Sequence, residues 1–145
     1  MVNEVKIATS KEEWEAIMEL RYNVLRKPWG RPYETATDVL ENNSINAYIG
    51  DSKGKVLACG RLHENEKNMG QIRFMAVHPD YRGKGLGKLI TVYLENIARQ
   101  KGYNKIQLQA RENALEFYKR CGYQVKEKSF LLWDTIQHYS MEKQL

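Results

Sequence analysis

The feature that most constrains this chain is a basic, glycine-punctuated turn between two apolar segments, Tyr81-Arg82-Gly83-Lys84-Gly85-Leu86-Gly87-Lys88. The run before it, residues 72–77, is short and mostly apolar and is followed by Pro79, which is typical of a buried strand. Behind the turn, apolar residues recur at spacings of three and four, which predicts an amphipathic helix over 85–101. The turn therefore joins the end of a strand to the start of a helix.

The glycines coincide with that helix start, where backbone N–H groups have no partner inside the helix. The positive end of the helix dipole and the missing Cβ atoms let an anion approach the backbone closely. Arg82, Lys84 and Lys88 add positive charge at the same end. These properties together predict a pyrophosphate site, although glycines alone are equally typical of a turn that only caps a helix.

Residue spacing excludes two common phosphate loops. A Walker A loop needs a glycine five residues before Gly87 and a serine or threonine after Lys88, but Arg82 and Leu89 occupy those positions. The dinucleotide-binding fingerprint needs its third glycine three residues after the second, whereas the glycines of this turn alternate.

A second strand and helix follow the first pair. Residues 105–110 alternate like a strand, and Gly122 closes a short helical pattern. At this point the chain resembles the GNAT superfamily of N-acetyltransferases. Its acetyl-CoA signature, Arg/Gln-x-x-Gly-x-Gly/Ala, is similar to Arg82 through Gly87, and its downstream Asn, Phe-Tyr and Gly-Phe/Tyr pattern is similar to Asn113 through Tyr123.

The resemblance implies an α/β fold with a mixed, mostly antiparallel, splayed sheet of six to seven strands and about four helices. In such a fold the strand ending at Val77 and the strand beginning at Lys105 separate, and acetyl-CoA lies in the gap. The length of 145 residues fits one domain, 1–145.

Local signals place the remaining elements. Ser10 and Glu13 form a capping box that opens a helix, which Pro28 ends. Residues 51–54 are typical of a hairpin turn. The other predicted elements are a first strand at 5–8, a short helix near 35–40, hairpin strands at 45–50 and 56–62, a strand at 71–77, a helix at 114–121, and last strands at 123–128 and 138–143 joined by 129–137.

Composition narrows the class of function. The net charge is +5, but no basic block of five or more residues occurs, so we expect no nucleic-acid partner. The charged residues near the start argue against a signal peptide, and no apolar stretch approaches membrane-spanning length. Cys59 and Cys121 are far apart in sequence, which favours reduced thiols in the cytoplasm over a disulfide or metal site.

The resemblance assigns acetyl-CoA as co-substrate, with no metal. Tyr118 is the candidate general acid for the departing thiolate, against the alternative of a core tyrosine. Asn113 is expected to contact the CoA arm or, alternatively, only to cap its helix. The predicted cofactor-binding residues are Met75, Ala76, Val77, Arg82, Gly83, Lys84, Gly85, Leu86, Gly87, Lys88, Asn113 and Tyr118.

The general base stays open. Several GNAT enzymes carry a carboxylate on the strand before the glycine turn, but here that strand offers Gln71 and Arg73. His138 is the first candidate, because imidazole has a suitable pKa. One alternative is a proton path through water to the carboxylate of Glu64 or Glu66, and another is a different histidine, His63 or His78. A third is an amine that arrives neutral and needs no base.

The acceptor site is expected in the irregular segment 26–34. Trp29 and Tyr33 are predicted to wall a pocket, Glu34 or Asp38 to receive an ammonium, and Arg31 to hold a carboxylate. A surface loop anchored by tryptophan is an equal alternative.

These residues predict transfer of an acetyl group to a primary amine by direct attack in a ternary complex. A small-molecule amine is favoured over a peptide acceptor, and a homodimer is left open. The rival interpretation, motivated by the missing carboxylate, is a non-catalytic acetyl-CoA-binding sensor or assembly module.

Overall fold

The computed structural model describes residues 4–145. Residues 1–3, which belong to the segment considered above as a signal peptide, lie outside the described residues. The strands are β1 (Lys6–Ile7), β2 (Ile45–Gly50), β3 (Val56–Glu66), β4 (Met69–Val77), β5 (Lys105–Arg111), β6 (Gln124–Leu132) and β7 (Ile136–Gln144). The α-helices are α1 (Lys11–Leu25), α2 (Leu86–Gln100) and α3 (Leu115–Arg120). Short 3-10 helices cover Lys27–Trp29, Tyr33–Ala36, Glu41–Asn43, Pro79–Tyr81 and Glu112–Ala114.

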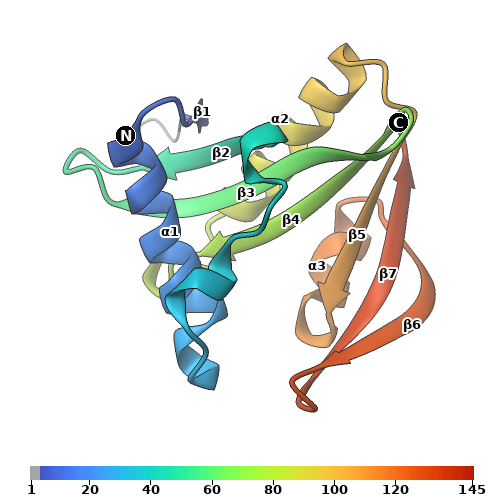
Figure 1. The fold of residues 1–145 in the computed structure, drawn as a ribbon. Helices are drawn as coiled ribbons and strands as arrows, with labels where there is room; N and C mark the ends of the chain where they lie inside the picture. The colour runs from blue at the N-terminus through green and yellow to red at the C-terminus, as the bar shows by residue number, and fades with distance from the viewer. Residues whose placement is uncertain (1–3) are drawn as a thin grey trace.

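The seven strands form one sheet in the order β1-β2-β3-β4-β5-β7-β6. All neighbours are antiparallel except β4 and β5, which are parallel. This parallel pairing runs only from Met69 to Ile72 on β4. Beyond Ile72 the two strands diverge, which divides the sheet into two halves (Figure 1). The predicted mixed, splayed sheet is confirmed.

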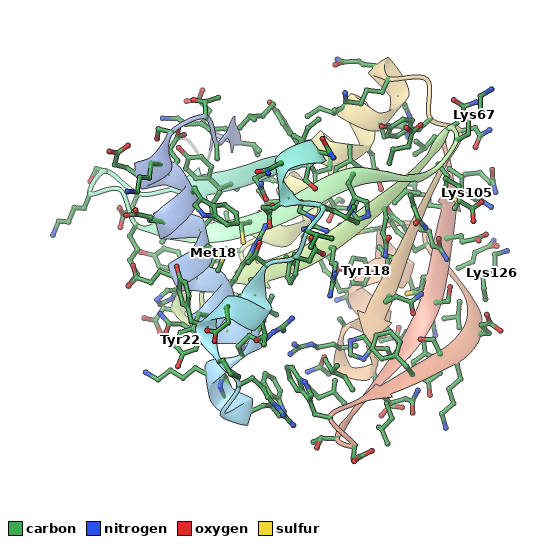
Figure 2. The ribbon with its side chains drawn as sticks, in the orientation of Figure 1. Met18, Tyr22, Lys67, Lys105, Tyr118 and Lys126 are labelled. Atoms are coloured by element: carbon green, nitrogen blue, oxygen red, sulfur yellow. The ribbon has the colours of Figure 1, made fainter. Side chains whose placement is uncertain are left out.

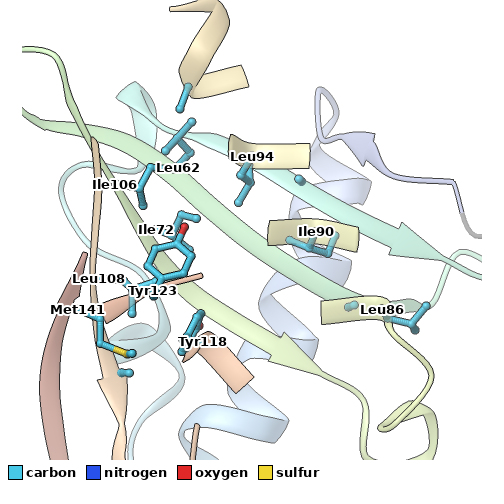
Figure 3. Close-up of a cluster of buried hydrophobic side chains, with 14 of the residues drawn as sticks. Leu62, Ile72, Leu86, Ile90, Leu94, Ile106, Leu108, Tyr118, Tyr123 and Met141 are labelled. Atoms are coloured by element: carbon cyan, nitrogen blue, oxygen red, sulfur yellow. The ribbon is translucent and has the colours of Figure 1, made fainter. Parts of the chain in front are cut away.

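Helices α1 and α2 cover opposite faces of the first half, and α3 lies against the second half (Figure 1). The larger core cluster joins α2 to the sheet through Ile90, Leu94 and Ile72, and it continues to Tyr118 on α3 (Figure 3). A smaller cluster under α1 contains Ile17 and Phe74. The larger cluster, which also contains Leu108 and Met141, joins the two halves of the sheet, and the smaller one holds α1 on the first half.

Two local predictions are confirmed at the level of side chains. The Ser10 hydroxyl accepts the Glu13 backbone N–H at 3.1 Å, and the Glu13 carboxylate accepts the Ser10 backbone N–H at 3.0 Å, so the capping box opens α1. The Asp51 carboxylate accepts the backbone N–H groups of Lys53 and Lys55, which closes the β2–β3 hairpin. In the described residues 4–145, no helix is long and apolar enough to cross a bilayer.

The short helix predicted near residues 35–40 is only partly present, because the 3-10 helix Tyr33–Ala36 reaches residues 35 and 36 and residues 37–40 are not helical. The segment wraps around buried arginines instead. Arg21 donates to the Ala36 carbonyl at 3.0 Å and to the Glu41 carboxylate at 2.8 Å. These contacts tie the segment to α1.

The last hairpin extends further than predicted, because β6 and β7 take up most of the expected connection 129–137. Trp133 and Asp134 make the turn with left-handed backbones at φ 53° and 55°. Tryptophan rarely adopts this conformation. Here the ring of Trp133 packs 6.3 Å from that of Trp29, with the Arg26 and Arg31 guanidiniums at 5.2 and 4.8 Å. These contacts hold the hairpin tip against the 3-10 segment after α1.

Candidate active site

The divergence of β4 and β5 opens two adjoining cavities. The larger, of about 720 Å³, lies between the end of β4, the glycine turn and α3. The smaller, of about 360 Å³, lies between β4, β5 and the β6–β7 hairpin. Met75, Arg111 and Tyr118 line both cavities. A group bound in one cavity can therefore meet a group bound in the other at these side chains.

The glycine turn has the geometry of an anion site. Gly83 and Gly85 have left-handed backbones at φ 76° and 81°, and Gly85 is the N-cap of α2. A Cβ built on either glycine would meet nothing within 4 Å, so the space beside the turn is open. Most of the predicted cofactor residues line the larger cavity: Met75, Ala76, Val77, Arg82, Gly83, Gly85, Leu86, Gly87, Lys88, Asn113 and Tyr118.

Two of the cofactor predictions need adjustment. The Lys84 ammonium lies 5.4 Å from the Tyr81 ring centroid, and the residue is not part of the cavity wall. Asn113 lines the cavity but does not cap α3, because it lies inside the 3-10 helix Glu112–Ala114 and Ala114 takes the N-cap position. The alternative of a plain helix cap for Asn113 is therefore wrong.

The wall of the larger cavity fits a polyanion with an apolar arm. Its charged residues are all cationic, namely Arg82, Lys88, Arg111 and Arg120, and it contains no aspartate or glutamate. The N–H groups at the start of α2 face the same space and lack helical partners. Apolar side chains such as Val77 and Phe117 complete the wall. The residues present therefore fit the pyrophosphate and pantetheine arm of a CoA thioester.

A bulge in β4 shapes the point where the cavities meet. Cys59 pairs with Ala76 and Arg61 with Arg73, so Gly60 alone lies opposite two residues, Phe74 and Met75. Phe74 has φ 54°, a strained conformation that costs on the order of 1–3 kcal/mol. A Cβ at Gly60 would come within 2.4 Å of the Met75 sulfur, so glycine is needed for this close approach. Because β5 has already separated, the bulged segment has no strand partner on that side.

Tyr118 lies at the junction of the two cavities. Its side chain comes from α3 and lies between the halves of the sheet (Figure 2). The residue is 7% exposed, and its hydroxyl makes no hydrogen bond to another residue of the described chain. Burial raises the pKa of the Tyr118 phenol, so the hydroxyl keeps its proton at neutral pH. Tyr118 belongs to the core cluster and to the cavity wall at once.

His138 lies in the smaller cavity, on β7 opposite Arg111. Its Nδ1 is 3.0 Å from the Ile136 carbonyl oxygen, which can only accept, so Nδ1 carries a proton and Nε2 is left as the acceptor of a neutral ring. The imidazole stacks on Phe130 at 4.4 Å. Burial lowers the pKa of His138, and the positive charges of Arg111, Arg26 and Arg73 lower it further against the effect of the Ile136 carbonyl. The ring is therefore neutral at neutral pH.

The other candidate bases lie elsewhere. Glu64 accepts the Asn68 backbone N–H at the β3–β4 turn, and Glu66 is exposed at the same end of the strand. His63 lies beside Arg61 and lines a different cavity together with Glu64. The His78 ring accepts the Asp80 backbone N–H within the turn after β4. None of these four candidates lines either of the adjoining cavities.

The residues proposed for the acceptor site are spread over three places. Trp29 lines the larger cavity, with the Arg111 guanidinium 4.6 Å from its ring centroid. Arg31 packs on Trp133. Tyr33 is 46% exposed against Tyr22, and Glu34 is exposed; neither they nor Arg31 line the two cavities.

Asp38 is also engaged, because its carboxylate binds the Arg61 guanidinium at 2.7 and 3.0 Å and the Arg73 guanidinium at 2.5 Å. These contacts hold the pKa of Asp38 down to about 2 against the opposing effect of burial. Besides His138 and Tyr118, the polar wall of the smaller cavity is formed by Arg26, which belongs to the segment 26–34 expected to form the acceptor site, and by Gln71, Arg73, Gln109 and Arg111, which lie outside that segment.

Comparisons with known proteins agree with this architecture. A family model described as "Acetyltransferase (GNAT) family" matches residues 14–123. The uncharacterized N-acetyltransferase YjcF of Bacillus subtilis (strain 168) is 30% identical over 137 residues, covering 94% of this chain and 96% of the relative. Glucosamine 6-phosphate N-acetyltransferase of Trypanosoma brucei brucei is 39% identical over 64 residues, 44% of each chain. The crystal structure of an acyl-CoA N-acyltransferase from Pseudomonas aeruginosa matches with a TM-score of 0.80 at 22% identity, covering 97% of this chain and 98% of that one.

The chain belongs to the GNAT family of acetyltransferases. Its enzymatic class is that of an N-acetyltransferase.

Proposed function

We propose that this protein transfers the acetyl group of acetyl-CoA to the primary amine of a small molecule, by direct attack in a ternary complex. The observation that carries the proposal is the pair of adjoining cavities that meet at Met75, Arg111 and Tyr118. Two substrates bound side by side can react there without a covalent enzyme intermediate. The volume of the smaller cavity, about 360 Å³, favours a small acceptor over a folded protein.

In this proposal the larger cavity holds acetyl-CoA, which supplies the acyl group as an activated thioester. The backbone N–H groups of the glycine turn, with Arg82 and Lys88, bind its phosphates. The end of β4 from Met75 to Val77, where β5 has already separated, offers backbone polar groups to its arm, and Asn113 lines the same cavity. No cluster of three or more potential metal ligands is found within residues 4–145, and the proposal uses no metal.

Two side chains are assigned to proton transfer. His138 accepts a proton at Nε2 from the ammonium or amine of the acceptor. The ring is suited to this because it is neutral and its Nδ1 alone is hydrogen-bonded, to the Ile136 carbonyl. Tyr118 holds a proton at its hydroxyl where the leaving thiolate sulfur is expected. In the relative from Trypanosoma brucei brucei, the printed name indicates an amino-sugar acceptor, which is consistent with a small primary amine here.

A screen of primary amines with purified protein and acetyl-CoA, detecting the released CoA thiol, tests the proposed function. We expect thiol release that depends on the amine and product masses increased by one acetyl group. The rival function is a non-catalytic acetyl-CoA sensor, favoured by the lack of any carboxylate in either cavity wall. Tight acetyl-CoA binding without turnover of any amine would support the sensor.

His138 is expected to give the pH profile an acidic limb. Because its pKa is lowered, the neutral form is lost only below its ordinary value of about 6.5. We expect kcat/KM to fall only at pH values below that ordinary imidazole pKa, since burial and the charges of Arg111, Arg26 and Arg73 disfavour the protonated ring. The measurement is kcat/KM from about pH 5 to 9 for the wild type and His138→Gln. A variant that keeps both the activity and the acidic limb would remove His138 from the chemistry.

Two further expectations concern the cellular location and the oligomeric state of the protein. A cytoplasmic location agrees with the two cysteines, which are both free thiols, Cys59 buried and Cys121 half-buried. Homodimerisation stays a prediction. The edge strand β6 exposes Val125, Phe130 and Leu131. Sedimentation analysis of variants at these positions tests whether this edge forms a dimer interface.

A further inference from the structure

The smaller cavity has an unusual charge balance. Arg26, Arg73 and Arg111 line it from three different elements, and its wall contains no aspartate or glutamate. Asp38 pairs with Arg73 from outside the cavity wall. Arg26 and Arg111 form no ion pair with any carboxylate in the part of the chain that the structure describes. The cavity proposed for the amine therefore carries uncompensated positive charge.

Arg26 and Arg111 converge on one atom. Arg26 donates to the Leu25 carbonyl oxygen at 2.9 Å and Arg111 donates to the same oxygen at 3.0 Å. Leu25 ends α1, so this oxygen lies at the negative end of a helix dipole. Arg26 also donates from Nε to the Thr35 carbonyl oxygen at 3.1 Å, but the two carbonyls occupy only part of the donor set of the two guanidiniums, and each has N–H groups left over. Burial and the repulsion from Arg111, Arg73 and Arg21 lower the pKa of Arg26 to about 10, in keeping with a buried guanidinium that has no carboxylate partner.

Two other buried arginines, Arg21 on α1 and Arg61 on β3, serve as an internal comparison. Arg21 and Arg61 are fully buried, and each has a carboxylate partner, Glu41 at 2.8 Å and Asp38 at 2.7 Å. This fold thus pairs its structural arginines with acids. Arg26 is 7% exposed and lines a cavity without an acid, which is the arrangement expected where an anionic ligand completes the site.

We propose that the acceptor is an amine that also carries an anionic group, a carboxylate or a phosphate, which Arg26 and Arg111 bind in the smaller cavity. This inference rests on the proposed function. The anion lies against the two guanidiniums at the end of α1, and the amine lies toward His138 and Tyr118 in the same wall. The arginines act by positioning the acceptor; Arg73 also lines the cavity, but its guanidinium is already paired with Asp38.

Matched pairs of amines that differ only in the anion test this proposal. Phosphoethanolamine is compared with ethanolamine, glucosamine 6-phosphate with glucosamine, and β-alanine with β-alaninamide. We expect the anionic member of at least one pair to have a kcat/KM higher by roughly 10- to 100-fold, the range for charged hydrogen bonds. The phosphate and carboxylate pairs distinguish the two sources of the anion. Equal kcat/KM within all pairs would overturn the proposal.

Variants then assign the preference to the arginines. Arg111→Gln is expected to reduce the ratio of kcat/KM between anionic and neutral partner toward one, chiefly through KM for the anionic amine. Arg99→Gln removes the same charge from an exposed position on α2 and is expected to leave the ratio unchanged. If Arg111→Gln is poorly folded, Arg26→Gln, which removes the other guanidinium proposed to bind the anion, provides the second measurement. A ratio that survives both substitutions would contradict the assignment.

A binding measurement separates this inference from the proposed function. With free CoA in place of acetyl-CoA no transfer occurs, so thermal shifts report acceptor binding alone. Stabilisation of the CoA-loaded protein by phosphoethanolamine or β-alanine, but not by ethanolamine or β-alaninamide, would support the anion site even if no amine were acetylated. Turnover of amines with no stabilisation by any anionic partner would leave the proposed function intact and reject the anionic acceptor.

Discussion

Tyr118→Phe is expected to lower kcat by about 10²- to 10⁴-fold, the usual contribution of a general acid, while the protein stays folded and still binds acetyl-CoA. The substitution removes one hydroxyl whose oxygen makes no hydrogen bond to the described chain, and the ring keeps its edge contacts with Phe117 at 5.0 Å and Tyr123 at 5.8 Å. Because the phenol acts on charge that develops in the transition state, KM for acetyl-CoA should change little. Steady-state kinetics with the amine found by the screen give both constants.

Tyr123→Phe is the matched control for this prediction. Tyr123 is also a buried tyrosine of the same core cluster, but its hydroxyl donates to the Glu95 carboxylate at 2.9 Å and it lines neither cavity. Loss of a hydrogen bond to a charged group costs about 1.5–3 kcal/mol of unfolding free energy, so this variant should melt at a lower temperature with normal kcat. If Tyr118→Phe showed the same pattern, Tyr118 would be a packing residue and the thiolate would leave without its proton.

Local signals in the sequence were sufficient to predict the geometry of the glycine turn at 82–87. Its left-handed glycines and its position at the start of α2 depend on neighbours in the chain alone, and the binding of a pyrophosphate there stays a prediction. The same is true of the capping box at Ser10 and the hairpin turn at Asp51. The splayed sheet was predicted through the family resemblance, and the parallel register that ends at Ile72 confirms it.

The acceptor side could not be predicted in this way, because its wall is assembled from distant segments. Arg26 and Arg111 meet at Leu25 only because α1 ends where β5 separates from β4, and no local pattern encodes that meeting. No local sequence pattern predicts the turn at Trp133 either, since its left-handed backbone depends on contacts with Trp29 and two arginines. The aromatic loop 26–34 was correctly singled out as irregular, but it supports the hairpin tip more than it walls the cavity.

Gly85→Asp is expected to abolish the stabilisation of the protein by acetyl-CoA. The new carboxylate would project from the N-cap of α2 into the open space beside the turn, where the pyrophosphate is proposed to bind. Two unit charges about 4 Å apart repel by about 4 kcal/mol at an effective dielectric constant of about 20, so affinity should fall on the order of 10³-fold. Thermal shift and calorimetric titration with acetyl-CoA measure this loss directly.

Two control variants separate charge from backbone strain in this experiment. Gly85→Asn has nearly the same shape and the same strain at φ 81° but no charge, so it should retain more of the affinity than Gly85→Asp does. Gly54→Asp places the same charge on a left-handed glycine at φ 84° in the β2–β3 hairpin, away from both cavities, and should bind acetyl-CoA as the wild type does. If folded Gly85→Asp kept the affinity of Gly54→Asp, the phosphates would bind elsewhere, and the turn would serve only to begin α2.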